Sequence, residues 1–321
     1  MGLRQVGRAA TKHLRKTTVG ACALFMLDNQ LAKVRLAYGD LNTNSGMAHD
    51  GLKLEESLAY IDWVYGDYQD EAGVNKFYGR IAEIGPGDNC GVALRFVADG
   101  AEKVDLVDRF YSRRDDRHNS EVYRALIERE GLAAYAGKDR EDQFGRIERH
   151  YGARASAEQF FADHGEYDFI VSRAVMEHVA SPPLSIQRMK SALKPGGTMI
   201  HVVDLKDHGM FTAYDFHELK FLEIPEWIYP EMTRATGRPN REPLSTYRNL
   251  LPGCAVKITS LVGGERLEPI AYDAIPRIQR DAAIDYVRKH KAKLQPRFRE
   301  EDERDLSVSG FIVTWTRPLN G

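Results

Sequence analysis

Cysteine is scarce in this sequence. Three cysteines, Cys22, Cys90 and Cys254, occur among 321 residues. An odd number at such wide spacing argues against a disulfide framework or a zinc knuckle, and favours a reducing compartment. We therefore expect a cytoplasmic protein in which each cysteine is a small buried side chain.

Long apolar runs are also missing. No run approaches the ~20 residues that cross a bilayer. The nearest, TTVGACALFML at 17–27, lacks a small-x-small cleavage site and continues into the helical pattern DNQLAKVRL, so we interpret it as mature sequence rather than a signal peptide. Upstream, basic residues recur every four positions, which indicates either a helix in weak peripheral contact with a membrane or polyanion, or a solvated terminus: Arg4, Arg8, Lys12 and Lys16.

Charge of one sign is not in excess. The chain carries 45 Lys and Arg against 47 Asp and Glu, for a net charge of -2. No global positive field would gather nucleic acid, so a nucleic-acid partner is not expected. With 43% hydrophobic and 29% charged residues and no internal repeat, the composition is that of an ordinary globular protein.

From about residue 80 onward, β-rich runs alternate with helical patterns. This alternation predicts βαβ units and an α/β, doubly wound, mostly parallel sheet over 79–321. Residues 1–78 are expected to form an N-terminal helical cap, and 206–254 a lid-like insertion after the fifth strand. The predicted strands are 80–85, 103–109, 147–152, 167–174, 197–205, 255–263 and 307–317.

A glycine loop follows the first predicted strand. Gly85, Gly87 and Gly91 are spaced so that the backbone could turn sharply and approach a ligand closely. Alone, the pattern is weak, and a plain tight turn is the alternative. Its position in the first βα unit, with Asp108 ending the next strand where a ribose hydroxyl acceptor belongs, indicates a nucleotide site.

Two carboxylates flank this loop. Glu83 and Asp88 would oppose the pyrophosphate of a dinucleotide at the helix N-terminus. They would instead favour a ligand that carries an ammonium and a sulfonium group but no phosphate. S-adenosylmethionine (SAM) fits this requirement.

Four segments in order then resemble a known family. AEIGPGDN, DLVD, YDFIVSRAVMEHV and LKPGGTMIHVVDL look like successive motifs of the class I SAM-dependent methyltransferases, in particular the bacterial type with a generic methyltransferase domain. The resemblance covers about residues 80–205. It implies the family's Rossmann-like methyltransferase fold, a seven-stranded sheet with an antiparallel last strand, and SAM as the cofactor.

The same resemblance implies positions around the cofactor. The glycine loop would hold the methionine part, Asp108 the ribose hydroxyls, and 157–158 the adenine edge, although GARASAE lacks the aspartate frequent there in the family. The expected cofactor residues are Glu83, Gly85, Pro86, Gly87, Asp88, Asp108, Arg109, Ala157, Glu158, Ser172 and Arg173.

Methyl transfer from a sulfonium is an in-line displacement, so the enzyme aligns the reactants and removes a proton from a hydroxyl acceptor. Asp204, Asp207 and His208 follow the fifth strand at the edge where acceptor and cofactor would meet. His208 is the preferred base because its ordinary pKa of ~6.5 suits proton removal near neutrality. No metal is expected, since His201 and Asp204 point to opposite faces of one strand.

Other acceptor-side candidates lie nearby. Glu177 and His178 are predicted to begin the helix after the fourth strand, either at the acceptor mouth or as ordinary helix-start residues. The aromatic, arginine-rich insertion is interpreted as a lid, with a helical hairpin as the alternative. The expected acceptor-side residues are His178, Tyr214, His217, Arg238, Asn240, Arg241 and Tyr247.

Together these patterns predict a SAM-dependent methyltransferase that acts on oxygen, or nitrogen, of a small-molecule or saccharide-like acceptor. Three alternatives keep the same fold: an NAD-dependent oxidoreductase, a non-catalytic nucleotide-binding partner subunit, and an RNA methyltransferase. The acidic glycine loop argues against the first and the balanced charge against the last.

Overall fold

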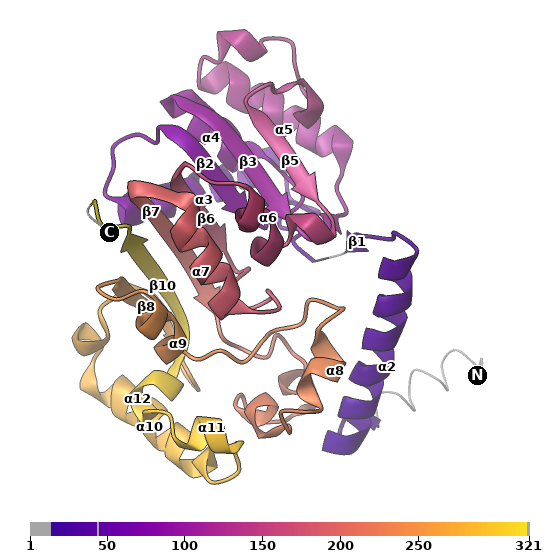
Figure 1. The fold of residues 1–321 in the computed structure, drawn as a ribbon, viewed down its shortest axis with the longest axis vertical. Coiled ribbons are helices and arrows are strands. Elements are labelled where there is room, and N and C mark those ends of the chain that lie inside the picture. The colour runs from indigo at the N-terminus through magenta and orange to yellow at the C-terminus, as the bar shows by residue number, and fades with distance from the viewer. Residues whose placement is uncertain (1–13, 44, 320–321) are drawn as a thin grey trace.

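The computed structural model describes residues 14–43 and 45–319, and Arg4, Arg8 and Lys12 of the proposed basic helix lie outside them. One sheet organises the chain (Figure 1). Its strands, in the spatial order β5-β3-β2-β6-β7-β10-β8-β9, are β5 (Ile147–Tyr151), β3 (Ala101–Asp108), β2 (Gly79–Ile84), β6 (Tyr167–Arg173), β7 (Leu193–Asp204), β10 (Val308–Thr316), β8 (Ala255–Leu261) and β9 (Arg266–Ile270). A small parallel pair, β1 (Asn42–Thr43) and β4 (Tyr111–Ser112), lies apart.

The sheet is doubly wound, as predicted. Five neighbouring strands, from β5 to β7, are parallel. The β10 strand then pairs antiparallel with both β7 and β8. The chain order reverses between β2 and β6, and the carboxyl ends of strands flanking such a reversal are where ligands bind in open α/β sheets.

The expectation of seven strands was wrong by one. The additional strand, β9, pairs antiparallel with β8 at the sheet edge. Its five residues, RLEPI, include a proline and are mostly exposed. Proline is tolerated at a sheet edge because one side of the strand needs no ladder partner, so this short polar strand lacks the alternating pattern that reveals inner strands.

Helices cover both faces of the sheet (Figure 1). The two buried clusters on opposite faces include α3 to α5 on one side and α6 and α7 on the other. The helices are α2 (Thr18–Ala37), α3 (Leu54–Ala72), α4 (Gly91–Asp99), α5 (Asp116–Arg129), α6 (Ala157–Asp163), α7 (Pro182–Ala192), α8 (Tyr229–Thr233), α9 (Leu244–Leu250), α10 (Arg277–Lys291), α11 (Pro296–Arg299) and α12 (Glu303–Leu306).

The helix after β6 begins later than predicted. Glu177 and His178 lie in a turn, and α7 starts at Pro182. The Ser181 hydroxyl accepts a hydrogen bond from the Leu184 N–H, and proline at the first position has the fixed φ of a helix start. Because the helix starts only at Pro182, Glu177 and His178 lie in the loop at the carboxyl edge of the sheet.

The N-terminal helices share the cores of the sheet. Ile61, Val64 and Tyr68 of α3 belong to one buried cluster, and Phe25 of α2 belongs to the other. The α2 helix packs beside α8 of the insertion, away from the sheet in Figure 1. Within the described residues, no helix is both long and apolar enough to span a bilayer.

Candidate cofactor and acceptor site

A cavity of about 720 Å³ lies at the carboxyl ends of β2, β3 and β6. Pockets of about 300–1,000 Å³ hold drug-sized ligands, so this one can take a nucleoside-sized cofactor. Twelve of the expected cofactor, catalytic and acceptor-side residues line it: Glu83, Gly85, Pro86, Gly87, Asp108, Arg109, Ala157, Glu158, Arg173, His178, His208 and Arg238.

The glycine loop forms the floor of this cavity in a conformation that requires glycine. Gly85 and Gly87 have φ angles of 66° and 68°, in the left-handed region. A Cβ atom on Gly87 would lie 2.5 Å from the Gly46 carbonyl oxygen. The same oxygen accepts a 3.0 Å hydrogen bond from the Asp88 N–H, so the segment around Gly46 lies directly on the loop.

Two carboxyl groups on the cavity wall have pKa values shifted toward neutrality. Burial raises the pKa of Glu83 to about 7, against the opposing charge of Arg149. Burial also raises the pKa of Asp108 to about 6, although its Oδ1 accepts a 2.9 Å hydrogen bond from the Phe110 N–H. A cationic ligand near Glu83 and hydroxyl donors at Asp108 would favour the ionised forms, which matches the ammonium and ribose of SAM.

Two expected cofactor residues lie behind this wall. Asp88 is buried, and its Oδ2 accepts a 3.2 Å hydrogen bond from the His49 N–H. Ser172 is fully buried, with its hydroxyl 2.8 Å from Nδ1 of His201. Neither side chain lines the cavity.

Of the three catalytic candidates, only His208 lines the cavity. The Asp207 carboxylate accepts hydrogen bonds from the N–H groups of Gly209, Phe211 and Thr212 and from the Thr212 hydroxyl, at 2.6–3.0 Å. Asp204 Oδ1 accepts a 3.0 Å hydrogen bond from the Lys206 N–H. These carboxylates stabilise the turn that carries His208.

Three acceptor-side candidates from the sequence lie elsewhere. Tyr214 accepts a 2.8 Å hydrogen bond from Arg15 of the N-terminal segment. His217 pairs with Glu223 at 2.8 Å. Tyr247 is fully buried, because its ring packs in the core beneath the sheet's carboxyl edge. None of the three lines the cavity.

Of the remaining insertion candidates, Arg238 alone lines the cavity. Arg241 is buried and donates to the carbonyls of Phe221 and Ile224. Asn240 donates through Nδ2 to the carbonyls of Met176 and Val179, at 2.8 and 3.1 Å. These side chains thus hold the insertion in place, and its cavity-facing parts are His208, Met210 and 236–239.

One wall of the cavity, formed by α3 and the segment before it, was not predicted from the sequence. Tyr60, Val64 and Tyr68 of α3 line it, together with residues around His49. The spacing of four residues places these three side chains on one face of a helix, so the sequence periodicity already indicated this shared face. The link from that face to the cofactor edge needed tertiary structure.

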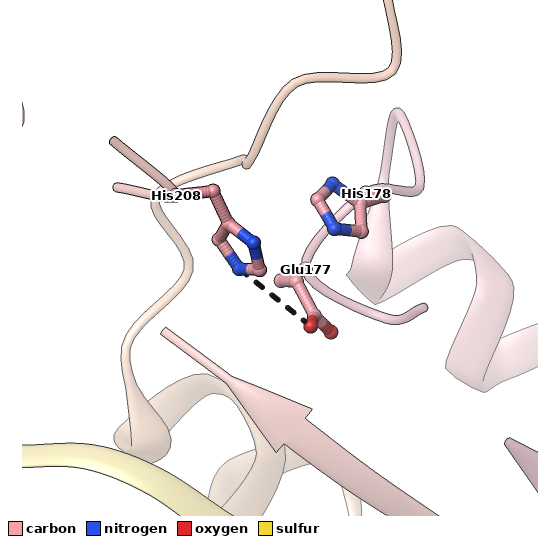
Figure 2. Close-up of side chains that lie close together, drawn as sticks. All are labelled: Glu177, His178 and His208. Atoms are coloured by element: carbon pink, nitrogen blue, oxygen red, sulfur yellow. Dashed lines mark ion pairs between the residues drawn. The ribbon is translucent and has the colours of Figure 1, made fainter. Parts of the chain in front are cut away.

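Beside His208, His178 also lines the cavity, and the buried Glu177, which does not line it, lies next to both, as Figure 2 shows. Glu177 Oε1 lies 3.9 Å from Nε2 of His208, and the rings of His178 and His208 are 4.8 Å apart between centroids. Burial raises the pKa of Glu177 well above its usual range and, with His208 nearby, lowers that of His178 to about 4. Glu177, His178 and His208 are called the Glu177 cluster below.

Comparison with known proteins agrees with this architecture. The model of a methyltransferase domain family matches residues 68–243, more than half of the chain. With the doubly wound sheet and the glycine-loop cavity, this match shows that the chain belongs to the class I SAM-dependent methyltransferases. Among curated proteins, none matches the sequence.

Solved structures with a similar arrangement include three methyltransferases. Phosphoethanolamine N-methyltransferase 2 of Haemonchus contortus, in complex with SAM, is 14% identical with a TM-score of 0.41; the match covers 79% of this chain, which spans only 52% of that enzyme. A putative sarcosine dimethylglycine methyltransferase of Galdieria sulphuraria is 16% identical, with coverages of 83% and 86% and a TM-score of 0.40. A SAM-dependent methyltransferase of Mesorhizobium loti is 15% identical, with coverages of 80% and 98% and a TM-score of 0.39.

Proposed function

We propose that this SAM-dependent methyltransferase transfers the methyl group to an oxygen, or a nitrogen, of a small-molecule or saccharide-like acceptor. The observation that supports this proposal is that one cavity is lined both by the glycine loop with Asp108 and by His178 and His208 of the Glu177 cluster. The first part suits the cofactor, and the second provides groups that can activate an acceptor. The dehydrogenase alternative is set aside because the chain belongs to the methyltransferase family.

Within this proposal the cofactor lies along the glycine loop. Glu83 would face the methionine ammonium and Asp108 the ribose hydroxyls, since both carboxyls line the cavity. Residues 1–78 would act as a cap, because α3 forms a wall of the same cavity. Arg238, whose side chain is about one-quarter exposed, would contact an anionic or hydroxylated part of the acceptor.

The transfer itself requires alignment and removal of one proton. The acceptor oxygen forms a bond to the methyl carbon while the carbon–sulfur bond breaks, and the electron pair of that bond returns to sulfur, which becomes a neutral thioether. The acceptor hydroxyl loses its proton at the Glu177 cluster. His208 is the exposed member of the cluster, with its side chain 32% exposed.

Isothermal titration with S-adenosylhomocysteine, with NAD(H) titrated in parallel, tests the cofactor part. We expect the first compound alone to bind. Radiolabelled SAM is then offered with panels of hydroxylated saccharides, small alcohols, amines and RNA. Transfer to RNA in a strongly salt-dependent manner, or tight cofactor binding without transfer to any member, would contradict the proposed acceptor class.

His208→Ala tests the acceptor part. We expect it to retain S-adenosylhomocysteine affinity and lose turnover, because His208 lines the cavity in the Glu177 cluster and not at the glycine loop. His217→Ala is a matched control, since His217 pairs with Glu223 outside the cavity. Equal activity of His208→Ala and the control would remove His208 from the reaction.

We also propose a cytoplasmic location. Its support is that Cys22, Cys90 and Cys254 are all free thiols, which is usual in a reducing compartment. The proposed membrane contact of the basic N-terminus falls on residues outside those that the structure describes, apart from Lys16, which pairs with Asp215.

A further inference from the structure

The Glu177 cluster has the composition of a metal site. Glu177 and His178 come from the turn after β6, and His208 from the turn after β7 (Figure 2). Each residue offers one ligand atom, and the three atoms lie within 4.8 Å of one another. The prediction that no metal binds rested on the positions of His201 and Asp204. In the structure His201 contacts Ser172 in the core, and a different set of residues is brought together.

Glu177 lacks the partners that a buried carboxylate requires. Its side chain is 1% exposed, and in the described part of the chain neither of its oxygens has a hydrogen-bond partner. Nδ1 of His178 is likewise buried without a partner. Burying a charged or polar group costs free energy unless the group is paired, hydrogen-bonded or bound to a metal.

The backbone holds these side chains in place. Asn240 fixes the Glu177 turn through three hydrogen bonds, since its N–H donates to the Glu177 carbonyl at 2.5 Å and its Nδ2 to the carbonyls of Met176 and Val179. His208 has a φ angle of 48°, a left-handed conformation that is costly for a residue with a Cβ. Non-glycine residues held in this region cluster at functional sites.

We propose that Glu177, His178 and His208 bind a divalent transition-metal cation such as Zn²⁺ or Mn²⁺ in the wall of the cavity. Two imidazoles and one carboxylate, with the remaining positions open, are a common ligand set for such ions in catalytic sites. Ligand atoms lie about 2.0–2.2 Å from such an ion. Inward side-chain movements of roughly 1 Å would bring atoms now up to 4.8 Å apart onto one ion.

A second group of possible ligands, Asp105, Glu148 and His150, lacks this character. Asp105 Oδ2 already accepts hydrogen bonds from Arg80 and from the Tyr167 hydroxyl, each at 2.9 Å. Lys103 lies 3.2 Å from its Oδ1. These side chains already neutralise and hydrogen-bond the Asp105 carboxylate, so a metal ion is not needed there. The second cluster therefore serves as a control for metal binding by the Glu177 cluster.

The inferred ion deepens the proposed function and rests on it for its role. An acceptor hydroxyl that occupies an open position would lose its proton more readily, because a bound cation stabilises the oxyanion. The proton would pass to solvent water before or during transfer of the methyl group to that oxygen. His208 would then act as a ligand, which replaces its predicted role as a free base.

Metal binding is tested on the full, tag-free chain after chelator treatment and buffer exchange. Co²⁺ is titrated as the probe, with its visible absorption read for stoichiometry and Zn²⁺ competition read for affinity. We expect one ion per chain. Loss of outer-sphere partners alone costs 10–100-fold in metal affinity, so Glu177→Gln and His208→Ala should each weaken binding by at least about tenfold.

His150→Ala is the control from the second cluster and should bind Co²⁺ like the original chain. S-adenosylhomocysteine titration of each variant checks that the cavity is intact. Thermal denaturation gives an independent measure: Zn²⁺ should raise the Tm of the original chain more than that of Glu177→Gln. Absence of stoichiometric binding, or binding lost only in His150→Ala, would overturn the inference.

Activity separates this inference from the proposed function. Stoichiometric Co²⁺ binding without transfer to any acceptor would leave the metal site standing and refute the acceptor class. Transfer at an unchanged rate in excess chelator, with the ion shown to be removed, would refute the role of the ion in acceptor activation.

Discussion

At the residue scale, Asp108 provides the sharpest test of the cofactor site. Asp108→Ala should weaken S-adenosylhomocysteine binding by about 1–3 kcal/mol, the magnitude of a hydrogen bond to a charged group and its unsatisfied partner. Because burial raises the pKa of Asp108 to about 6, affinity of the original chain should also fall as the pH drops through 6. Calorimetric titration between pH 5 and pH 8 measures both effects.

Asp204→Asn is the control for this measurement, because Asp204 lies at the same edge of the sheet but does not line the cavity. It should bind the cofactor product with unchanged affinity. If Asp108→Ala also bound it unchanged, the assignment of Asp108 to the ribose would be refuted.

Glu83 links the site to stability. Its pKa is raised from 4.5 to about 7 in the folded chain, so between these pH values the folded state holds a proton that the unfolded state has lost. Stability without cofactor should therefore fall as the pH rises through this window and stay lower above it. Glu83→Gln removes this loss and should be more stable than the original chain at pH 8 by about 3 kcal/mol.

Urea unfolding at pH 8 and at pH 4 measures this difference. The two chains should differ little at pH 4, where the carboxyl is protonated in both states. Because Asp108 titrates in both chains, its contribution cancels in the comparison. The same difference at the two pH values would mean that Glu83 acts through packing and not through its charge.

Individual residues were predictable to the extent that their roles are local. The glycines, Glu83 and Asp108 belong to one strand–loop–helix unit and the strand after it, so sequence order places them together. Asp207 and Arg241 show the opposite case. Both are polar residues near the carboxyl edge of the sheet, where a site was expected. Their hydrogen bonds to backbone groups become visible only in the folded chain.

At the element scale, the segment around Gly46 and the glycine loop form one unit. Gly87→Ala should destabilise the chain and weaken cofactor binding, because the new Cβ would meet the Gly46 carbonyl oxygen at 2.5 Å. Thermal denaturation and S-adenosylhomocysteine titration measure the two effects.

Gly73→Ala is a matched control for that prediction. Gly73 ends α3 with a φ of 63°, close to the 68° of Gly87, but a Cβ there would contact nothing within 4 Å. Both variants carry the left-handed penalty of roughly 1–2 kcal/mol. Only Gly87→Ala should lose cofactor affinity, and equal losses in the two would show that the contact with Gly46 is unimportant.

Elements with a strong periodic pattern were predicted well, and those without one were not. The buried parallel strands read as continuous apolar runs because both faces are covered. The edge strand β9 has no such run, and Glu177 and His178 were placed at the start of the helix after β6, which begins at Pro182. The missed cavity wall on α3 had a clear period but needed the fold to show what it faces.

At the scale of the whole molecule, the N-terminal helices are integrated into the sheet's cores. The buried cluster that contains Phe25 of α2 also contains β10 residues, and the cluster with Tyr68 of α3 includes β2 and β6. Residues 1–78 were expected to form a helical cap beside the sheet from their position and helical pattern. Shared buried surface couples the unfolding of neighbouring elements, so we propose that this cap does not unfold independently.

Differential scanning calorimetry tests this coupling. We expect one cooperative transition that includes α2 and α3, because removing either helix would expose residues of a core that the sheet also needs. S-adenosylhomocysteine at about 100 times its Kd should stabilise the folded chain by about 2.7 kcal/mol and shift this transition as a whole. Two transitions, of which the ligand moves only one, would instead show that the cap and the sheet are separate folding units.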